Sequence, residues 1–230
     1  MCARVGILVR RGSWTLSVRS FLLIFLATTI IAVAFLHVLY PFLAITERVP
    51  TRILVLDGWL PTYDLNKAAA TYLTGNYQQL LAVSAAYEFQ NIDQDPGNAY
   101  VVTHILVRDG VPPDQVNPVI FLGMKVDRTF YSAIAVKAWC SQHGIPLQSL
   151  DIATLGPHAR RSRLLYQKAL GNGIKIGVIA LDDPAYDSRH WWRSSEGVRE
   201  VLFEFVAYIY VRLFFWAPPA NELHLLPASE

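Results

Sequence analysis

Residues 21–45 contain no Asp, Glu, Lys or Arg, and this uncharged run restricts the fold of the chain more than any other feature. A run of roughly 20 apolar residues is what a helix needs to cross a bilayer. Four arginines and no acidic residue precede it, and the positive-inside tendency places such a segment in the cytoplasm. We therefore predict a cytoplasmic N-terminus (1–20), a transmembrane anchor (21–45), an exported domain (46–217) and a C-terminal tail (218–230).

Two alternatives concern the apolar segments. A cleaved signal peptide is the alternative to an anchor, but the run exceeds a usual h-region and no small-x-small cleavage site precedes Thr46. The stretch 201–216 is also apolar, yet Glu204 and Arg212 would each cost about 2.5–3.5 kcal/mol at the bilayer centre. We predict a helix buried against the sheet there, with a position against the membrane surface as the alternative.

The composition excludes several classes of protein. The chain has 230 residues, of which 53% are hydrophobic and 17% charged, so it is neither disordered nor a fibre. The 20 basic residues include the four leading arginines, which leaves 20 − 4 = 16 basic against 18 acidic residues in the rest. No bulk positive charge remains for nucleic acid. Cys2 and Cys140 lie on opposite sides of the span and cannot pair within one chain; Cys2 is in addition a site where acylation is conceivable.

Beyond the anchor, short apolar runs alternate with longer amphipathic ones. Nearly continuous apolar strands without tight hairpin turns suit a parallel sheet covered on both faces. We predict a doubly wound, mostly parallel five-stranded Rossmann-like α/β sheet preceded by one N-terminal transmembrane helix. The expected strands are 53–56, 80–83, 119–122, 150–154 and 174–181, and the expected helices begin near residues 65, 99, 129, 158 and 195.

Ligands of open α/β sheets bind at the carboxyl ends of the strands. The segment Gly156 to Arg163 there combines His158 with Arg160, Arg161 and Arg163 at the start of a predicted helix. Cations at a helix N-terminus oppose the helix dipole, which makes sense if a phosphate or pyrophosphate fills the site. A solvated basic face with one arginine paired to Asp151 or Asp183 is the alternative.

His158 is the candidate general acid or base, with Asp57 or Asp127 orienting it or activating water. Ser84 follows a strand but lacks the Gly-x-Ser-x-Gly elbow of an acylated nucleophile. The histidines show no metal-ligand spacing, so we predict no metal site, although three aspartates (Asp57, Asp127, Asp183) would suit a hard cation. Neither a dinucleotide fingerprint nor a P-loop is present, and the cofactor is left unknown.

The order of motifs resembles the SanA/ElyC/YdcF family of bacterial envelope proteins, over roughly residues 52–210. The Gly-Val-Pro step at residues 110–112 and the His-x-x-Arg step from His158 to Arg161 are the more specific matches. Thr129 keeps the threonine of a family motif whose glutamate and asparagine are replaced here, Ser84 keeps the serine of a Ser-Gly turn, and Glu204 matches a glutamate of the closing helix.

The resemblance implies a single-pass protein of the bacterial inner membrane, with its domain in the periplasm and a role in lipid-carrier or peptidoglycan metabolism. We accordingly expect binding of a phosphorylated or pyrophosphorylated envelope intermediate, with or without turnover. His158, Asp57 and Asp127 are the expected catalytic residues, and Arg160, Arg161, Thr129, Ser84 and Glu204 the expected ligand-binding residues.

Two further hypotheses remain. One is a non-enzymatic module that docks unidentified partner proteins through the aromatic last helix and the pair Trp191 and Trp192. The other is a cytoplasmic enzyme that binds a nucleotide or methyl donor, which would require the reverse membrane topology.

Overall fold

The computed structural model describes residues 8–11, 13–57, 60–61, 64–86, 99–122 and 127–217. It divides into two compact units, one up to Leu39 and one from Tyr40 onward. Helix α1 (Val18–Leu43) starts in the first unit and ends in the second.

The first unit holds most of α1 and a short hairpin before it. Strands β1 (Leu8–Arg11) and β2 (Ser13–Leu16) pair antiparallel, which the sequence did not predict. Among the helices described, only α1 is long and apolar enough to span a membrane, and nearly all of its most apolar stretch is exposed. A membrane helix has this property because lipid, rather than protein, covers its side chains.

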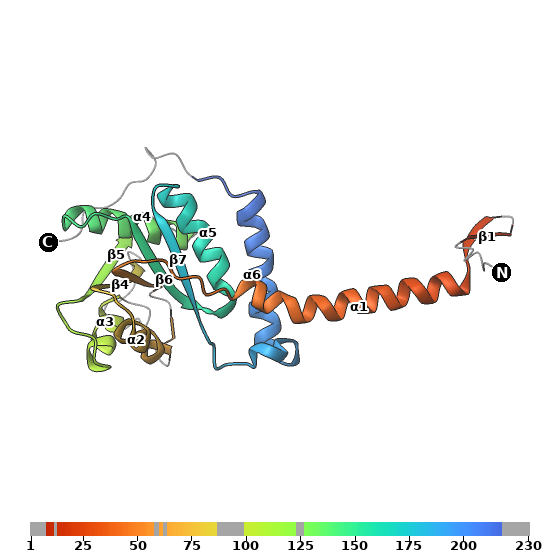
Figure 1. The fold of residues 1–230 in the computed structure, drawn as a ribbon, viewed down its shortest axis with the longest axis horizontal. Coiled ribbons are helices and arrows are strands. Elements are labelled where there is room, and N and C mark those ends of the chain that lie inside the picture. Colours follow the sequence, from red (N-terminus) through yellow and green to blue (C-terminus); the bar gives the residue numbers. More distant parts are fainter. Residues whose placement is uncertain are drawn as a thin grey trace. The chain divides into compact units, whose positions relative to one another are not determined.

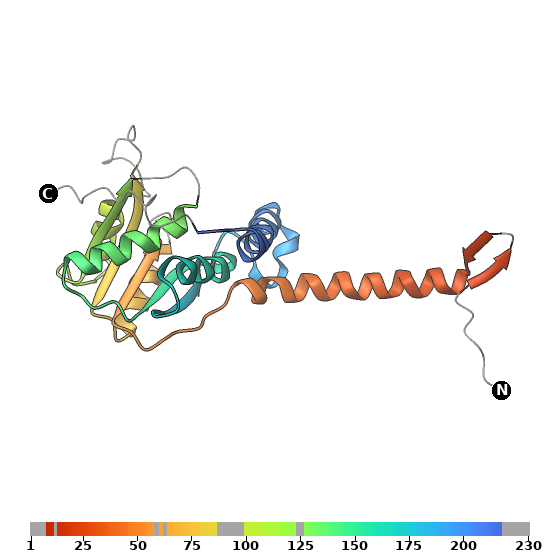
Figure 2. The same cartoon turned by 90° about the horizontal axis from the view of Figure 1, so that it is seen from above.

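The second unit is built on a five-stranded sheet whose neighbouring strands all run parallel, which confirms the predicted fold class (Figures 1 and 2). The spatial order is β5-β4-β3-β6-β7. The strands are β3 (Ile53–Asp57), β4 (Gln79–Ala86), β5 (Val116–Leu122), β6 (Ser149–Leu155) and β7 (Lys175–Leu181).

Helices cover both faces of this sheet, as the continuous apolar strands require. Alternate residues of each strand face opposite sides, so Leu54 and Leu56 pack in the core under α2 and α3, whereas Ile53 and Val55 pack in the core under α4 and α5. The helices are α2 (Leu65–Thr74), α3 (Ala99–Arg108), α4 (Arg128–Gln142) and α5 (Ala159–Leu170).

The last helix, α6 (Ser195–Leu213), packs against α5 outside the sheet. The Ser194 side chain accepts a hydrogen bond from the Gly197 N–H, which caps its first turn. Val201 and Val211 are buried on its inner side. The stretch is therefore a helix that packs on the domain, but against α5 and not against the sheet as predicted.

The chain order creates a switch point between β3 and β6. The chain passes from β3 outward through β4 to β5, then returns to the other side of β3 for β6 and β7. The connections after β3 and β6 consequently run to opposite faces, which opens a crevice at their carboxyl ends. The candidate site lies at this crevice.

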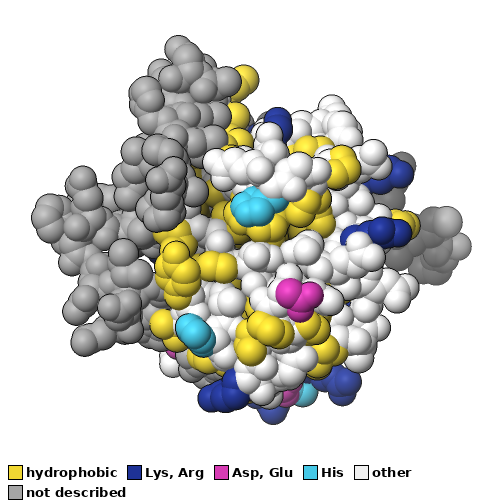
Figure 3. All heavy atoms as spheres, turned by 90° about the vertical axis from the view of Figure 1, so that its left-hand side faces the viewer, with side chains coloured by type: hydrophobic (Ala, Val, Ile, Leu, Met, Phe, Trp, Pro, Cys, Tyr) yellow, Lys and Arg dark blue, Asp and Glu magenta, His cyan; other side chains and the backbone are white. Residues whose placement is uncertain are grey.

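Charged side chains do not gather into a patch of one sign on the face shown in Figure 3. Lys, Arg, Asp and Glu side chains are scattered there among apolar and uncharged ones. The described part of this face therefore lacks the electrostatic footprint of a nucleic-acid-binding surface.

Candidate functional site at the switch point

The carboxyl ends of β3 and β6 bring together side chains that are far apart in the sequence. Asp57 is the last residue of β3. His158 ends a 3-10 turn, η2 (Gly156–His158), that leads from β6 into α5. Arg161 follows one turn later, and Glu204 reaches them from α6. Asp57, His158 and Glu204 are each at least nine-tenths buried.

Glu204, Arg161 and His158 form one hydrogen-bonded cluster. The Arg161 Nε donates to Glu204 Oε2 at 2.7 Å and its Nη2 donates to Oε1 at 2.9 Å, so the pair is bidentate. The His158 Nδ1 lies 3.0 Å from Glu204 Oε1 and 2.8 Å from Arg161 Nη2. Because each side chain is held by the other two, the orientation of the imidazole is fixed.

The opposite nitrogen of His158 faces Asp57. Its Nε2 lies 3.8 Å from Asp57 Oδ2, which is just beyond hydrogen-bond distance. A neutral imidazole nitrogen either donates or accepts, so Nδ1 serves Glu204 or Arg161 but not both. With the proton on Nδ1, the ring donates to Glu204, and Nε2 presents a lone pair toward Asp57.

The two carboxyl groups on either side of the imidazole have opposite pKa shifts. Burial raises the pKa of Asp57, although His158, the Thr154 hydroxyl and Arg161 act in the other direction. Burial would also raise the pKa of Glu204, but His158 and Arg161 together outweigh it and lower that pKa to about 2. Glu204 therefore stays ionised, whereas burial makes the protonated form of Asp57 more favourable than it is for an exposed aspartate. Carboxyl groups whose pKa values are pushed apart in this way are typical of acid–base sites.

A stripe of buried polar groups continues from His158 along α5. Ser162 and Tyr166 follow at intervals of four residues, so all three lie on one face of the helix. The oxygens of Ser162, Tyr166 and Thr154 and the Asp57 Oδ2 are buried, without a hydrogen-bond partner among the described residues. Burial and then the charge of Asp57 raise the pKa of the Tyr166 hydroxyl. Unpaired buried polar atoms are costly, so such a cluster at a strand end is typical of a functional site.

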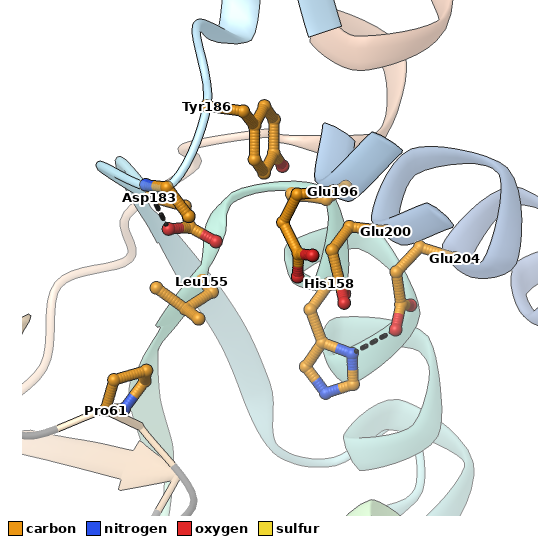
Figure 4. Close-up of a pocket in the computed structure, with 10 residues that line it drawn as sticks. Pro61, Leu155, His158, Asp183, Tyr186, Glu196, Glu200 and Glu204 are labelled. Carbon is orange, nitrogen blue, oxygen red and sulfur yellow. Dashed lines mark hydrogen bonds and ion pairs between the residues drawn. The ribbon is translucent and has the colours of Figure 1, made fainter. Parts of the chain in front are cut away.

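A pocket of about 160 Å³ opens beside the cluster (Figure 4). Its walls come from α6, from the segment after β7 and from the turn after β6. Figure 4 shows the carboxyl groups of Glu196, Glu200 and Glu204 in a row along α6, with His158 below them and Asp183 and Tyr186 opposite. Glu204 pairs with Arg161, and Glu196 and Glu200 share Arg199. The pocket therefore has four carboxyl groups against two arginines and keeps an excess of negative charge.

The structure brings together four of the predicted site residues: Asp57, His158, Arg161 and Glu204. Asp127 does not join them. It is exposed, precedes α4 and does not line the pocket. Thr129, in the first turn of α4, is buried and does not line the pocket.

Ser84 lies on the other face of the sheet from Asp57. Ser84 lies two and four residues after Ala82 and Leu80, so it points to the same face of the sheet as these residues, which pack under α2 and α3. Its Oγ accepts a hydrogen bond from the backbone N–H of Ala99, the first residue of α3, at 3.0 Å. Ser84 thus accepts a hydrogen bond from one of the backbone N–H groups that a helix N-terminus leaves without an intrahelical partner, which is a structural role.

Two arginines of the predicted anion cluster interact with the protein itself. The Arg160 guanidinium lies 4.1 Å from the centre of the Phe42 ring and its Nε donates to the Phe42 carbonyl. Arg163 donates to the Ile176 carbonyl and pairs with Glu47. The basic segment therefore neutralises and anchors parts of the domain, and only Arg161 reaches the site.

Sequence reasoning missed the buried hydroxyls and most of the pocket. The signals were present as spacings of four residues: His158, Ser162 and Tyr166 on one predicted helix, and Glu196, Glu200 and Glu204 on the last one. No pattern pointed to Thr154, because one threonine in an apolar strand is common.

The described residues contain no group of three or more His, Cys, Asp and Glu side chains that could hold a metal ion. No protein-family model, curated protein or solved structure matches the chain.

Proposed function

We propose that the domain is an acid–base enzyme that acts on a phosphorylated, sugar-bearing intermediate of the bacterial cell envelope. The observation that carries this proposal is the buried imidazole of His158 between Glu204, whose pKa is lowered, and Asp57, whose pKa is raised. The envelope substrate comes from the sequence resemblance. The reaction class comes from the side chains.

Glu204 holds His158 in the orientation and tautomer in which Nε2 lies toward Asp57 and accepts a proton during the reaction. In a hydrolysis, Nε2 takes a proton from the water whose oxygen bonds to the electrophilic atom of the substrate, while a protonated Asp57 gives one to the leaving oxygen whose bond to that atom breaks. The proton on Nε2 then returns to the Asp57 carboxylate, from which it is 3.8 Å away. Both groups recover their starting states, and one water is consumed.

The charge of the pocket decides which part of the substrate it accepts. Asp183, Glu196, Glu200 and Glu204 line it, and two arginines, Arg161 and Arg199, pair with three of these four carboxyl groups, so an excess of negative charge remains. Carboxylates accept hydrogen bonds from sugar hydroxyls but repel a phosphate. We therefore assign the sugar of the intermediate to the pocket, with its phosphate outside this acidic wall.

Binding and turnover are measured with the full-length chain in detergent micelles. The probes are undecaprenyl pyrophosphate and the same carrier bearing a peptidoglycan disaccharide. We expect tighter binding of the sugar-bearing probe, and a rate loss of about 10²–10⁴-fold in His158→Gln, which is the usual contribution of a general acid–base. His143→Gln is the matched control, because His143 is exposed at the end of α4.

Each result bears on a different part of the proposal. Equal affinity for the two probes would contradict the sugar assignment. Unchanged turnover in His158→Gln, or a loss as large in His143→Gln, would contradict the catalytic role of His158. If the protein bound neither probe, the proposal that its substrate is an envelope intermediate would be contradicted.

The docking hypothesis loses part of its support in this structure. Trp191 is 2% exposed, so it packs inside the domain and does not present a binding surface. The outward side of α6 remains, and it is considered next.

A further inference from the structure

The C-terminal half of α6 exposes a row of large apolar side chains. Phe203 is 64% exposed, Val206 66% and Tyr210 52%. They follow at intervals of three and four residues, so they share one face of the helix. Exposed neighbours extend this face, which we call the outer face of α6: Leu202, Phe203, Val206, Tyr210, Leu213 and Phe214, followed by Trp216.

The orientation of α6 is fixed from its inner side. Val201, Glu204 and Val211 are buried there, and Glu204 is held by the Arg161 pair. The outer face cannot turn inward without breaking that buried ion pair. Exposed single apolar residues are ordinary, but a contiguous row of this kind marks an interaction surface.

The same helix contacts the end of α1 within the second unit. The ring of Tyr208 meets the ring of Phe42 edge-on, with centroids 5.6 Å apart. Arg160 holds Phe42 from the other side, through its ring and its carbonyl. Phe42 lies in the last turn of α1, the one described helix able to span a membrane. The point where the chain leaves the span is therefore fastened to α6.

The composition of the outer face fits the boundary of a bilayer. Phe, Tyr, Trp and Leu prefer the region between headgroups and acyl chains. Arg212 is exposed in the last turn of α6 and is long enough to reach anionic headgroups. The polar first half of the helix carries Arg199 with Glu196 and Glu200, so the apolar character is confined to the half that includes Tyr208.

We propose that the outer face of α6 lies in the lipid headgroup region of the membrane that α1 spans. This inference is independent of the reaction proposed above, because no residue of the outer face of α6 lines the pocket. It depends on α1 lying in the bilayer, which the experiment measures separately.

The test uses the full-length chain with Cys2 and Cys140 replaced by serine, reconstituted into vesicles of phosphatidylethanolamine and phosphatidylglycerol. A fluorophore is attached at Leu213→Cys, and a nitroxide-bearing lipid serves as quencher. Leu73→Cys is the matched control, because Leu73 is an exposed leucine on α2. Ile30→Cys, exposed in the middle of α1, reports on the span itself.

We expect several-fold stronger quenching at Leu213 than at Leu73, and strong quenching at Ile30. Equal quenching at Leu213 and Leu73 would overturn the proposal, and so would weak quenching at Ile30. Quenching at Leu213 that falls as the protein-to-lipid ratio rises would also overturn it, since a second copy of the chain would then cover the face. Tyr210→Cys repeats the measurement one turn away if the first variant does not fold.

Discussion

Asp57 and Asp151 are buried aspartates on neighbouring strands, yet their surroundings differ completely. Asp151 lies near the amino end of β6, opposite Leu54, and both of its oxygens are occupied. Its Oδ1 accepts from the Val49 N–H at 3.0 Å, and its Oδ2 accepts from the Tyr77 hydroxyl at 2.7 Å. Asp57 lies at the carboxyl end of β3, where its Oδ2 has no hydrogen-bond partner among the described residues.

This difference shows how to separate a structural carboxylate from a chemical one when both are buried. Asp151 is held by neutral donors, and its fit is so close that a Cβ on Gly177 would come within 1.9 Å of its Oδ1. Asp57 faces a histidine at 3.8 Å and carries a raised pKa. The arrangement around Asp151 stabilises the fold. The arrangement around Asp57 suits the exchange of a proton between its carboxyl group and His158.

Replacing each aspartate by asparagine should give a large difference in stability between the two variants. In Asp151→Asn an amide N–H₂ opposes one of the two donors, and the loss of a hydrogen bond to a charged group costs about 1.5–3 kcal/mol. Asp57→Asn replaces a carboxyl group whose charge is disfavoured by burial and whose Oδ2 accepts no hydrogen bond from the described residues, so the free energy of unfolding should change by less than about 1 kcal/mol. Urea unfolding of the full-length chain in detergent measures both. Equal losses would abolish the distinction between the two residues.

The pH dependence of stability should separate Glu204 from Asp57. The pKa of Glu204 is lowered from 4.5 to about 2, so its ionised form contributes stability above pH 4.5, of order 3 kcal/mol. That contribution disappears as the pH falls toward 2. Glu204→Gln should therefore be destabilised relative to the native chain near neutral pH, and the difference should shrink in acid.

The contribution of Asp57 to stability should change with pH in the opposite direction to that of Glu204. The folded pKa of Asp57 is raised, so the stability it contributes is present below its ordinary pKa of 3.8 and is lost as the pH rises through the folded value. Asp57→Asn should gain stability relative to the native chain over that same range. Unfolding measured over a pH series gives both trends, and parallel curves for the two variants would refute the opposite shifts.

Two tyrosines offer a smaller, matched test. Tyr77 donates to Asp151 at 2.7 Å, so Tyr77→Phe should lose about 1.5–3 kcal/mol. The Tyr166 hydroxyl is buried without a partner among the described residues, so Tyr166→Phe should be neutral or stabilising. A loss in Tyr166→Phe as large as in Tyr77→Phe would mean that a bound water joins its hydroxyl to the Asp57 cluster.

The smallest change concerns Thr154. Its hydroxyl lowers the pKa of Asp57, so Thr154→Val should raise that pKa further while stability changes by less than about 1 kcal/mol. Carbon-13 NMR of the aspartate carboxyl groups follows the titration directly. A downward shift would show that the hydroxyl does not stabilise the Asp57 carboxylate.

Much of the fold was predictable because the signals are local. The runs 53–56 and 150–154 became β3 and β6 with at most one further residue at each end, since consecutive apolar residues already define a buried parallel strand. The β1–β2 hairpin was not predicted because the residues before the span were interpreted by their charge alone. His158 and Arg161 were found from the basic cluster after the fourth strand and Glu204 through the resemblance, but neither signal could tell that Arg160 contacts Phe42 instead.

By itself, the sequence determined the membrane-length helix, the alternation of strands and helices and the acidic spacing on the last helix, since each depends on residues within a few positions of one another. Only the tertiary structure decided which polar groups meet. His158 and Glu204 are 46 residues apart, yet lie within 3.0 Å, while Asp57 and Ser84 lie on adjacent strands, one register position apart, and face opposite sides of the sheet. Strand order and the twofold alternation of side chains settle such distances, and both arise only when the whole sheet has formed.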